Sequence, residues 1–248
     1  MRSITGGLPR LVTFPLTKDK KLKASVNNRG FDYKKRYDMK YTHLMWDFNG
    51  TIFDDAEAGI KSVNKMLCER GLSPIPSKER YKEIFDFPIE EYYRSLGFDF
   101  DAEPYEVLAP IWVDLYNRNA EEAGLCEGVK ETMEKVRALG VEQSVLSACE
   151  LGMLTRYLKR LGVREYLNEV MGLDNIHARS KLALAYEWIE KNKGARVLMI
   201  GDTTHDFETA EALGADCVLY AGGHQSREKL MRCGCPVIDN ICEIIEYL

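Results

Sequence analysis

The sequence predicts an α/β fold in which helices cover both faces of a parallel sheet and a helical segment follows the first strand. Two observations support this prediction. From residue 42 onward, short apolar segments alternate with amphipathic helical segments, which is the pattern of a parallel sheet with helical crossovers. Between the first strand and Cys126 this rhythm stops, because only helical patterns occur there.

Short strands are expected at residues 42–46, 142–146, 169–172, 196–200 and 217–220, with a weaker one at 237–238. The intervening helices are expected at residues 129–139, 151–161, 180–191 and 205–213. Ligands in such sheets bind at the carboxyl ends of the strands. Residues that directly follow a strand are therefore the first candidates for a functional site.

The segment after the first strand is expected to form helices at residues 57–70, 78–85, 89–95 and 105–123, with Pro110 starting or kinking the last one. The expected core consists of residues 39–55 and 127–248, and residues 56–126 are expected to form a separate helical cap. Residues 1–38 are basic and rich in turn residues. They are expected to be a loosely held extension, or to precede a true start at Met39; a strand added at a sheet edge is the alternative.

Composition excludes several classes of function. A net charge of −5 provides no basic stripe for nucleic acid, and no apolar run approaches the roughly 20 residues of a membrane span. The seven cysteines are scattered and odd in number, which favours reduced thiols over a disulfide framework. We therefore expect a cytoplasmic protein without a nucleic-acid or membrane partner; the sequence indicates no oligomeric state.

The first candidate motif is Asp47-Phe48-Asn49-Gly50-Thr51, directly after the first strand. A carboxylate here can attack phosphorus and form an aspartyl-phosphate, which splits one difficult displacement into two easier ones. Gly50 allows a sharp turn of the backbone. Taken alone, Asp47 fits equally well as a cap of the following turn.

The second motif, at residues 201–206, follows the strand expected at 196–200 and contains Asp202 and Asp206. Two carboxylates four residues apart at a helix start can face the same side and hold a hard cation. An Asp that caps a structural helix is the alternative. Convergence with Asp47 favours the cation, because carboxylates that meet without one repel each other.

Two further residues follow or approach strand ends. Ser147 closes the strand expected at 142–146, where its hydroxyl and the following N–H groups can grip phosphoryl oxygens at a helix start. Lys181 stands at the start of an amphipathic helix, where its ammonium can balance a phosphate and a carboxylate. The alternatives are a helix-capping serine and a solvated lysine.

In this order the motifs resemble those of the haloacid dehalogenase (HAD) superfamily, whose signature is D-x-D-G-T, a Ser or Thr that ends strand two, a Lys, and G-D-x-x-x-D. The resemblance covers the chain from about Tyr41 to its end, and is nearest to phosphoglycolate phosphatase-like members, whose loops the segment 222–226 also resembles. It implies a Rossmann-like HAD core with a C1-type cap and a magnesium-dependent phosphatase.

The resemblance also implies roles for particular residues. Asp47 would be the nucleophile, and Ser147 and Lys181 would bind and neutralise the transferring phosphoryl group. Mg²⁺ would be held by Asp47, the backbone carbonyl of Asn49, Asp202 and, directly or through water, Asp206. The residues expected to contact the substrate are Gly50, Thr51, Ser147, Ala148, Lys181 and Arg94.

Asn49 departs from the family pattern, which has a second Asp as general acid and base at this position. An amide has no proton to exchange near neutral pH, and such help is worth about 10²–10⁴-fold in rate. Three consequences stay open: turnover restricted to good leaving groups, a proton carried by another residue, of which His205 is the first candidate, or a protein that only binds phosphorylated ligands. His177 is also expected near the mouth of the site.

These observations predict a phosphatase acting on a small phosphorylated metabolite, with phosphoglycolate as the first substrate to test. A catalytically weak or inactive phospholigand-binding protein is the alternative. A phosphonatase-type reaction would need a cap lysine, for which Lys61, Lys65 and Lys82 are available. Selectivity is expected to come from cap residues, namely Phe87, Tyr92, Tyr93 and Arg94.

Overall fold

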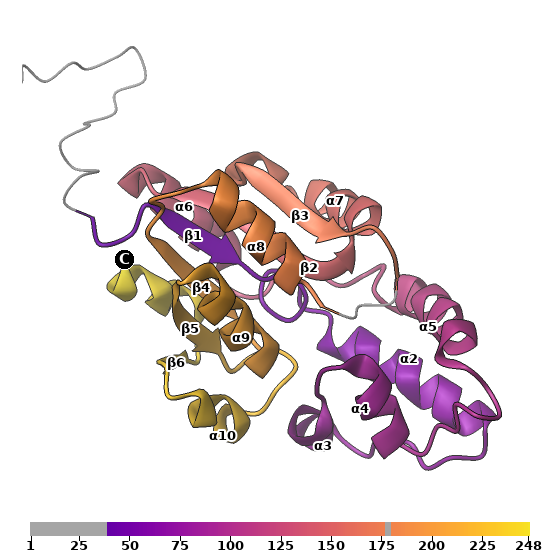
Figure 1. Ribbon diagram of the computed structural model, residues 1–248. Coiled ribbons are helices and arrows are strands. Elements are labelled where there is room, and N and C mark those ends of the chain that lie inside the picture. The colour runs from indigo at the N-terminus through magenta and orange to yellow at the C-terminus, as the bar shows by residue number, and fades with distance from the viewer. Residues whose placement is uncertain (1–38, 177–179) are drawn as a thin grey trace, which may run out of the picture.

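The computed structural model describes residues 39–176 and 180–248, and the expectations for residues 1–38 and for His177 lie outside this part. Its sheet is parallel and has six strands in the order β3-β2-β1-β4-β5-β6 (Figure 1). The strands are β1 (His43–Trp46), β2 (Glu142–Glu150), β3 (Glu169–Leu173), β4 (Val197–Gly201), β5 (Asp216–Tyr220) and β6 (Val237–Ile238). The expected α/β fold class is confirmed.

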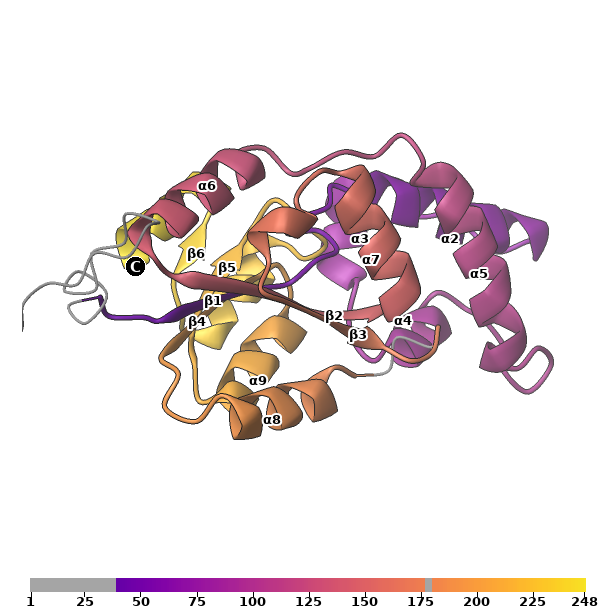
Figure 2. The same cartoon turned by 90° about the horizontal axis from the view of Figure 1, so that it is seen from above.

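Helices cover both faces of this sheet. Figure 2 shows α6 (Val129–Leu139) and α7 (Leu151–Arg160) over one face, and α8 (Leu182–Lys191) and α9 (Thr204–Leu213) over the other. The remaining helical elements of the core are α10 (Arg227–Leu230), η1 (Arg164–Tyr166), η2 (Met231–Cys233) and η3 (Ile241–Tyr247).

The central strand β1 is buried on both sides because its side chains alternate. Leu44 and Trp46 belong to the apolar cluster under α6 and α7, whereas Met45 packs with Trp188 of α8. Burial of both faces explains the continuous apolar pattern of this strand. The end of β1 is therefore held by packing on both faces and by pairing with β2 and β4, and this fixes where the next loop begins.

Between β1 and α6 the chain forms α2 (Ala56–Glu69), α3 (Lys78–Ile84), α4 (Ile89–Ser95) and α5 (Tyr105–Asn119). These helices lie beyond the carboxyl ends of the strands (Figure 1) and share an apolar cluster of their own. We call residues 56–119 the helical insertion. Among the described residues, no helix is long and apolar enough to span a membrane.

The helix α5 ends four residues before the predicted position, at Asn119 instead of residue 123. The chain leaves the helix because the segment after it pairs with the loop that follows β1: Phe53 bridges Leu125, and the Cys126 N–H donates to the Ile52 carbonyl at 3.0 Å. Pro110 lies inside α5. Tertiary pairing thus overrides the local helical pattern.

The insertion is fastened to the core through α3. Lys82 donates from its Nζ to the carbonyl of Ala221 at 2.5 Å, and its own carbonyl accepts from the Ser226 N–H at 3.0 Å. Lys229 of α10 donates to the Phe85 carbonyl at 2.8 Å. These bonds hold the insertion against the loop after β5, over the carboxyl end of the sheet.

Candidate active site

The ends of β1 and β4 bring two acidic loops together. Trp46 pairs with Ile200, and the Asp47 N–H donates to the Ile200 carbonyl at 2.8 Å. Asp202 and Asp206 follow β4. One carboxylate oxygen from each of Asp47, Asp202 and Asp206 lies within 4.8 Å of the others, and all three side chains are buried. We call these three residues the carboxylate cluster.

Lys181 is buried against this cluster. Its Nζ donates to Asp47, to Asp206 at 2.5 Å and to the Leu146 carbonyl at 3.2 Å. Burial alone would lower the pKa of Lys181, but Asp206 and Asp47 raise it above its ordinary value. An ammonium has three donors, so the protein itself uses all of them.

Asp206 is held mainly by its own loop. Its Oδ2 accepts from the Thr203 N–H at 2.9 Å, the Thr203 hydroxyl at 2.7 Å and the Asp202 N–H at 3.1 Å. Thr203 is the N-cap of α9 and forms a capping box with Asp206. Thr203 holds the N-cap position, so neither Asp202 nor Asp206 caps α9 from that position, which was the structural alternative for this motif. Asp206 therefore anchors Lys181 and the loop together.

Glycines leave the space that these carboxylates occupy. A Cβ on Gly50 would lie 2.3 Å from Asp202 Oδ2, one on Gly223 2.2 Å from the same atom, and one on Gly201 2.2 Å from Asp206 Cγ. Gly50 also has a φ of +73°, which L side chains rarely adopt. The small residues of both motifs thus permit close approach of backbone and carboxylate.

Ionisation is costly within the cluster. Burial raises the pKa of Asp47 well above its ordinary value, and Asp206 adds to the rise while Lys181 opposes it. Burial also raises the pKa of Asp202 to about 6, against the effect of His224. For Asp206 the effect of burial is outweighed by Lys181, which lowers the pKa. A cation would favour the ionised forms, and the all-oxygen donors fit a hard divalent ion.

Ser147 does not start a helix as predicted. The strand β2 continues to Glu150, with a register shift between Leu146 and Glu150, and α7 begins only at Leu151. Glu150 caps that helix by accepting from the N–H groups of the next turn. Ser147 Oγ accepts from the Cys149 N–H at 3.1 Å, and Ser147 and Ala148 line the pocket beside Asp47.

The Asn49 amide is turned toward a carboxylate that sequence reasoning missed. Its Nδ2 donates to Asp55 Oδ2 at 2.8 Å and to the Tyr116 hydroxyl at 2.9 Å, and Tyr116 donates to the same Asp55 oxygen at 2.6 Å. The other oxygen accepts from the Gly50 N–H at 2.8 Å and faces His224 Nε2 at 3.2 Å. Asp55 is thereby satisfied on both oxygens, which suits a structural anchor.

His224 is the second residue that sequence reasoning missed. Its ring lies between Asp55 and the Tyr81 hydroxyl, which is 2.7 Å from Nδ1. Its backbone N–H donates to Asp202 Oδ2 at 2.6 Å. Burial would lower the pKa of His224, but Asp55, Asp202 and Asp47 raise it to about 9. A buried histidinium therefore ties the loop after β5 to both the insertion and the cluster.

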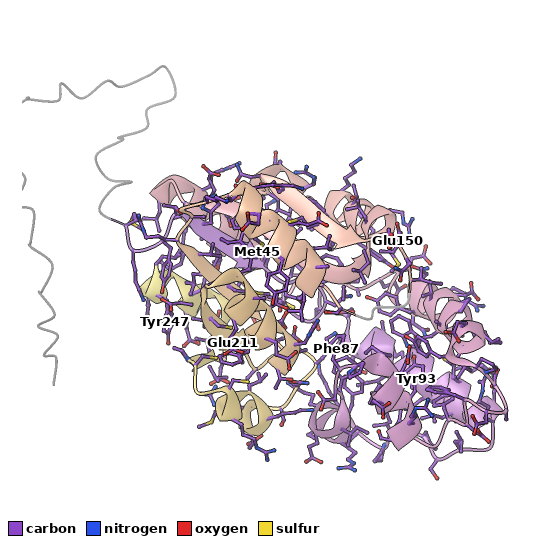
Figure 3. The ribbon with its side chains drawn as sticks, in the orientation of Figure 1. Met45, Phe87, Tyr93, Glu150, Glu211 and Tyr247 are labelled. Atoms are coloured by element: carbon purple, nitrogen blue, oxygen red, sulfur yellow. The ribbon has the colours of Figure 1, made fainter. Side chains whose placement is uncertain are left out.

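A pocket of about 130 Å³ opens from the cluster into the helical insertion. Its lining includes Asp47, Lys181 and many apolar side chains of α4 and α5. Three aromatic residues of this lining, Phe87, Tyr92 and Trp112, are called the aromatic wall below. Figure 3 shows Phe87 between the sheet domain and the insertion, and Tyr93 within the insertion.

The other predicted side chains lie as follows. Thr51 donates to Asp202 Oδ1 at 3.0 Å, and His205 lines the pocket, where it stacks on Phe87. Arg94 points away: its guanidinium is 3.5 Å from Glu91 and lies over the Phe100 ring. Its predicted contact with substrate is not supported, because it is on the outer side of α4 and outside the pocket lining.

The lysines considered for a phosphonatase-type reaction are also placed elsewhere. Lys61 and Lys65 are exposed, and Lys82 is committed to the Ala221 carbonyl. None of them lines the pocket.

Comparison with known proteins identifies the family. Residues 44–220 match the family model for haloacid dehalogenase-like hydrolases. Over 206 residues the chain is 24% identical to the tyrosine-protein kinase PtkA of Mycobacterium tuberculosis, covering 82% of this chain and 70% of that protein. It is 23% identical over 187 residues to phosphoglycolate phosphatase of Rhodobacter capsulatus, covering 73% and 85%.

Solved structures agree on the fold. A haloacid dehalogenase-like hydrolase from Streptococcus pneumoniae superposes with a TM-score of 0.72 at 17% identity, over 84% of this chain and 98% of that one. The structure of PtkA from Mycobacterium tuberculosis gives a TM-score of 0.69 at 22% identity, over 84% and 97%. With phosphoglycolate phosphatases among its relatives, the expected class of enzyme, a phosphoric monoester hydrolase, is supported, and the chain belongs to the haloacid dehalogenase-like hydrolase family.

Proposed function

We propose that this chain is a Mg²⁺-dependent phosphatase that hydrolyses a small phosphomonoester through an aspartyl-phosphate on Asp47. The observation that supports this most is the buried contact of Lys181 with both Asp47 and Asp206 at one end of the pocket. A carboxylate, an ammonium and two further carboxylates in one water-poor site supply what phosphoryl transfer needs, which is positioning and neutralisation of charge.

In the first step an Asp47 oxygen attacks phosphorus while the bond to the leaving oxygen breaks. Lys181 stays charged, because Asp206 and Asp47 raise its pKa, and balances the charge of the phosphoryl group. A magnesium ion held by Asp47, Asp202 and the Asn49 carbonyl would add positive charge beside the same group. Water then releases phosphate from Asp47.

The helical insertion serves as the cap in this proposal. Its α3 is hydrogen-bonded to the loop after β5, and its apolar side chains close the pocket over Asp47. Exclusion of bulk water strengthens the electrostatic interactions within the site and protects the acyl-phosphate.

The rival function is a protein that binds phosphorylated ligands without turnover, as Asn49 would suggest. The intact set of Asp47, Lys181 and the two other carboxylates favours the enzyme, because simple phosphate binding has no use for a buried carboxylate aimed at the ligand. The Asn at position 49 removes the acid that protonates the leaving group, so it restricts the leaving groups that can depart. It does not affect the nucleophile, Asp47.

The test uses acetyl phosphate, whose leaving group needs no proton, with Mg²⁺ present. We expect wild type to hydrolyse it and to take up label from radiolabelled acetyl phosphate, and Asp47→Asn to do neither. Asp54→Asn is the matched control, because Asp54 is exposed and lies outside the pocket lining. Turnover that survives Asp47→Asn would refute the nucleophile; binding of a phosphate analogue without any wild-type turnover would support the rival.

A further inference from the structure

The pocket beyond the carboxylate cluster presents uncovered apolar surface to a ligand. Phe87, Trp112 and Val113 line it and are only half-buried. Phe87 stacks on His205 with the ring centroids 4.9 Å apart, and Trp112 stacks on Tyr116 at 4.6 Å, so both rings are fixed in place. The volume of about 130 Å³ is close to the roughly 150 Å³ of an apolar cavity that admits benzene.

A polar atom of the same wall has no partner. The Tyr92 hydroxyl is buried and makes no hydrogen bond within the described part of the chain, although Tyr92 lines the pocket. Buried hydroxyl groups are almost always hydrogen-bonded. The hydroxyl is closed to solvent in this structure, so a ligand with a polar substituent on an apolar body would satisfy it once the Tyr92 side chain turns toward the pocket.

A short anionic leaving group such as that of phosphoglycolate fits this lining poorly. Among the described lining residues, Lys181 is the single lysine or arginine, and its three donors are already used. The His224 ring, which also lines the pocket, is already paired with Asp55 and Tyr81. Glu150, which is labelled in Figure 3, also lines the pocket, and its carboxylate, which caps α7, would repel a second carboxylate placed nearby. A carboxylate placed among apolar side chains without a partner is strongly disfavoured.

The chemistry of the first loop points to the same kind of leaving group. Asn49 cannot donate a proton to the departing oxygen. A phenolic oxygen leaves readily without one, because a phenol has a pKa of about 10, whereas an alkoxide is closer to hydroxide, whose conjugate acid has a pKa of about 15.7.

The apolar lining of the pocket and the missing acid at Asn49 are independent observations. From them we infer that the substrate is an aryl phosphomonoester, with its ring against Phe87 and Trp112 and a polar ring substituent at Tyr92. This inference rests on the proposed phosphatase activity. The bond from Asp47 to phosphorus forms as the bond from phosphorus to the aryl oxygen breaks. The electron pair leaves on that oxygen, which takes a proton from water. A water molecule then attacks phosphorus, and phosphate and the Asp47 carboxylate are released.

Four substrates distinguish the effect of an aromatic ring on binding from the effect of a good leaving group on the rate. Phenyl phosphate has both a ring and a good leaving group, benzyl phosphate has the ring alone, acetyl phosphate has the good leaving group alone, and phosphoglycolate has neither. With wild type and Mg²⁺, we expect similar low KM values for phenyl and benzyl phosphate and at least tenfold higher ones for the other two. We expect kcat for benzyl phosphate to be at least 100-fold below that for phenyl phosphate.

Variants of the wall test the placement of the ring. Trp112→Ala and Phe87→Ala are expected to raise KM for phenyl phosphate at least tenfold and KM for acetyl phosphate much less. A cooperative thermal unfolding transition like that of wild type shows that the variants fold. Tyr92→Phe is expected to raise KM severalfold only for substrates with a polar ring substituent, such as 4-hydroxyphenyl phosphate. Tyr186→Ala, an exposed aromatic residue of α8, is the matched control.

A binding measurement is independent of turnover. Phenylphosphonate, which cannot be hydrolysed, is expected to bind at least tenfold more tightly than methylphosphonate and to quench fluorescence in wild type but not in Trp112→Phe. Equal affinity of the two phosphonates, or phosphoglycolate turned over better than phenyl phosphate, would overturn the inference while leaving the phosphatase intact. If wild type does not hydrolyse acetyl phosphate at all, the proposed function itself is refuted.

Discussion

The two ends of the pocket differ in almost every physical respect. At one end the carboxylate cluster and Lys181 are buried and polar, and hydrogen bonds within the protein hold them in place. At the other end the aromatic wall is apolar, partly exposed to the pocket, and carries an unpaired hydroxyl on Tyr92. The polar end therefore suits a cation and a phosphoryl group, and the apolar end suits a part of the ligand that carries no charge.

The difference follows from the elements that carry each end. Asp47 and Asp202 follow β1 and β4, which are buried on both faces and paired along their length. The wall comes from the loop before α4, from α4 itself and from α5, within an insertion that has its own small apolar cluster. We infer that the first end determines the reaction and the second determines which leaving group reaches it.

The largest expected effect comes from Asn49→Asp, which would reduce the dependence on the leaving group. The new carboxylate would face Asp55, since Asn49 Nδ2 now lies 2.8 Å from Asp55 Oδ2. Two adjacent carboxylates raise the pKa of one of them, which is what a general acid requires. We expect kcat for benzyl phosphate to rise by about 10²–10⁴-fold, with acetyl phosphate changed little.

Steady-state rates on the two substrates check this prediction. Asn49→Ser, which supplies no acid, is the control for loss of the amide. An unchanged rate on benzyl phosphate in Asn49→Asp would mean that another residue carries the proton, and His205→Ala should then be the damaging variant.

A smaller effect is expected at His224, which stabilises the polar end. Its pKa is raised to about 9 from an ordinary 6.5, so its stabilising contribution is complete below pH 6.5 and is lost as the pH rises through 9. The difference corresponds to about 3 kcal/mol of unfolding free energy. Denaturant unfolding between pH 6 and 10 should show this loss in wild type and a much flatter profile in His224→Gln. A wild-type profile as flat as that of the variant would contradict the buried ion pair with Asp55.

The smallest effect concerns the affinity for Mg²⁺. Burial raises the pKa of Asp202 to about 6, and a metal must displace that proton. The apparent affinity is therefore expected to fall by about tenfold or more per pH unit below pH 6, because Asp47, whose pKa is also raised, must lose its proton as well. Calorimetric titration at several pH values measures this, with Asp202→Asn expected to bind weakly at every pH. A pH-independent affinity in wild type would show that Asp202 is not a ligand.

Much of the fold was predictable from local pattern. The strands are short apolar segments separated by helices, and they lie where predicted because burial of both sheet faces leaves a continuous apolar run; the exception is β2, which runs four residues further, to Glu150. Helix ends were less predictable. Residues 120–123 continue the helical pattern of α5, but the backbone bond from Cys126 to Ile52 pulls the chain away.

The site divides in the same way. Asp47, Asp202 and Lys181 stand in motifs of recognisable spacing, so their types and order were visible in the sequence. His224 and Asp55 belong to no such motif: they are 169 residues apart, and only the fold makes them a pair. The segment 222–226 resembles loops of phosphoglycolate phosphatase-like proteins, but nothing local indicates that its histidine is buried against a carboxylate.

The sequence by itself therefore determined the sheet, the helical insertion and the residues available for phosphoryl transfer, because strand periodicity and motif spacing are local properties. Only the tertiary structure decided that Arg94 points outward, that Ser147 lies within an extended strand, and that a ring-lined pocket meets Asp47. Those outcomes depend on which surfaces of the insertion and the core are buried together, and burial is a property of contacts between segments distant in the chain.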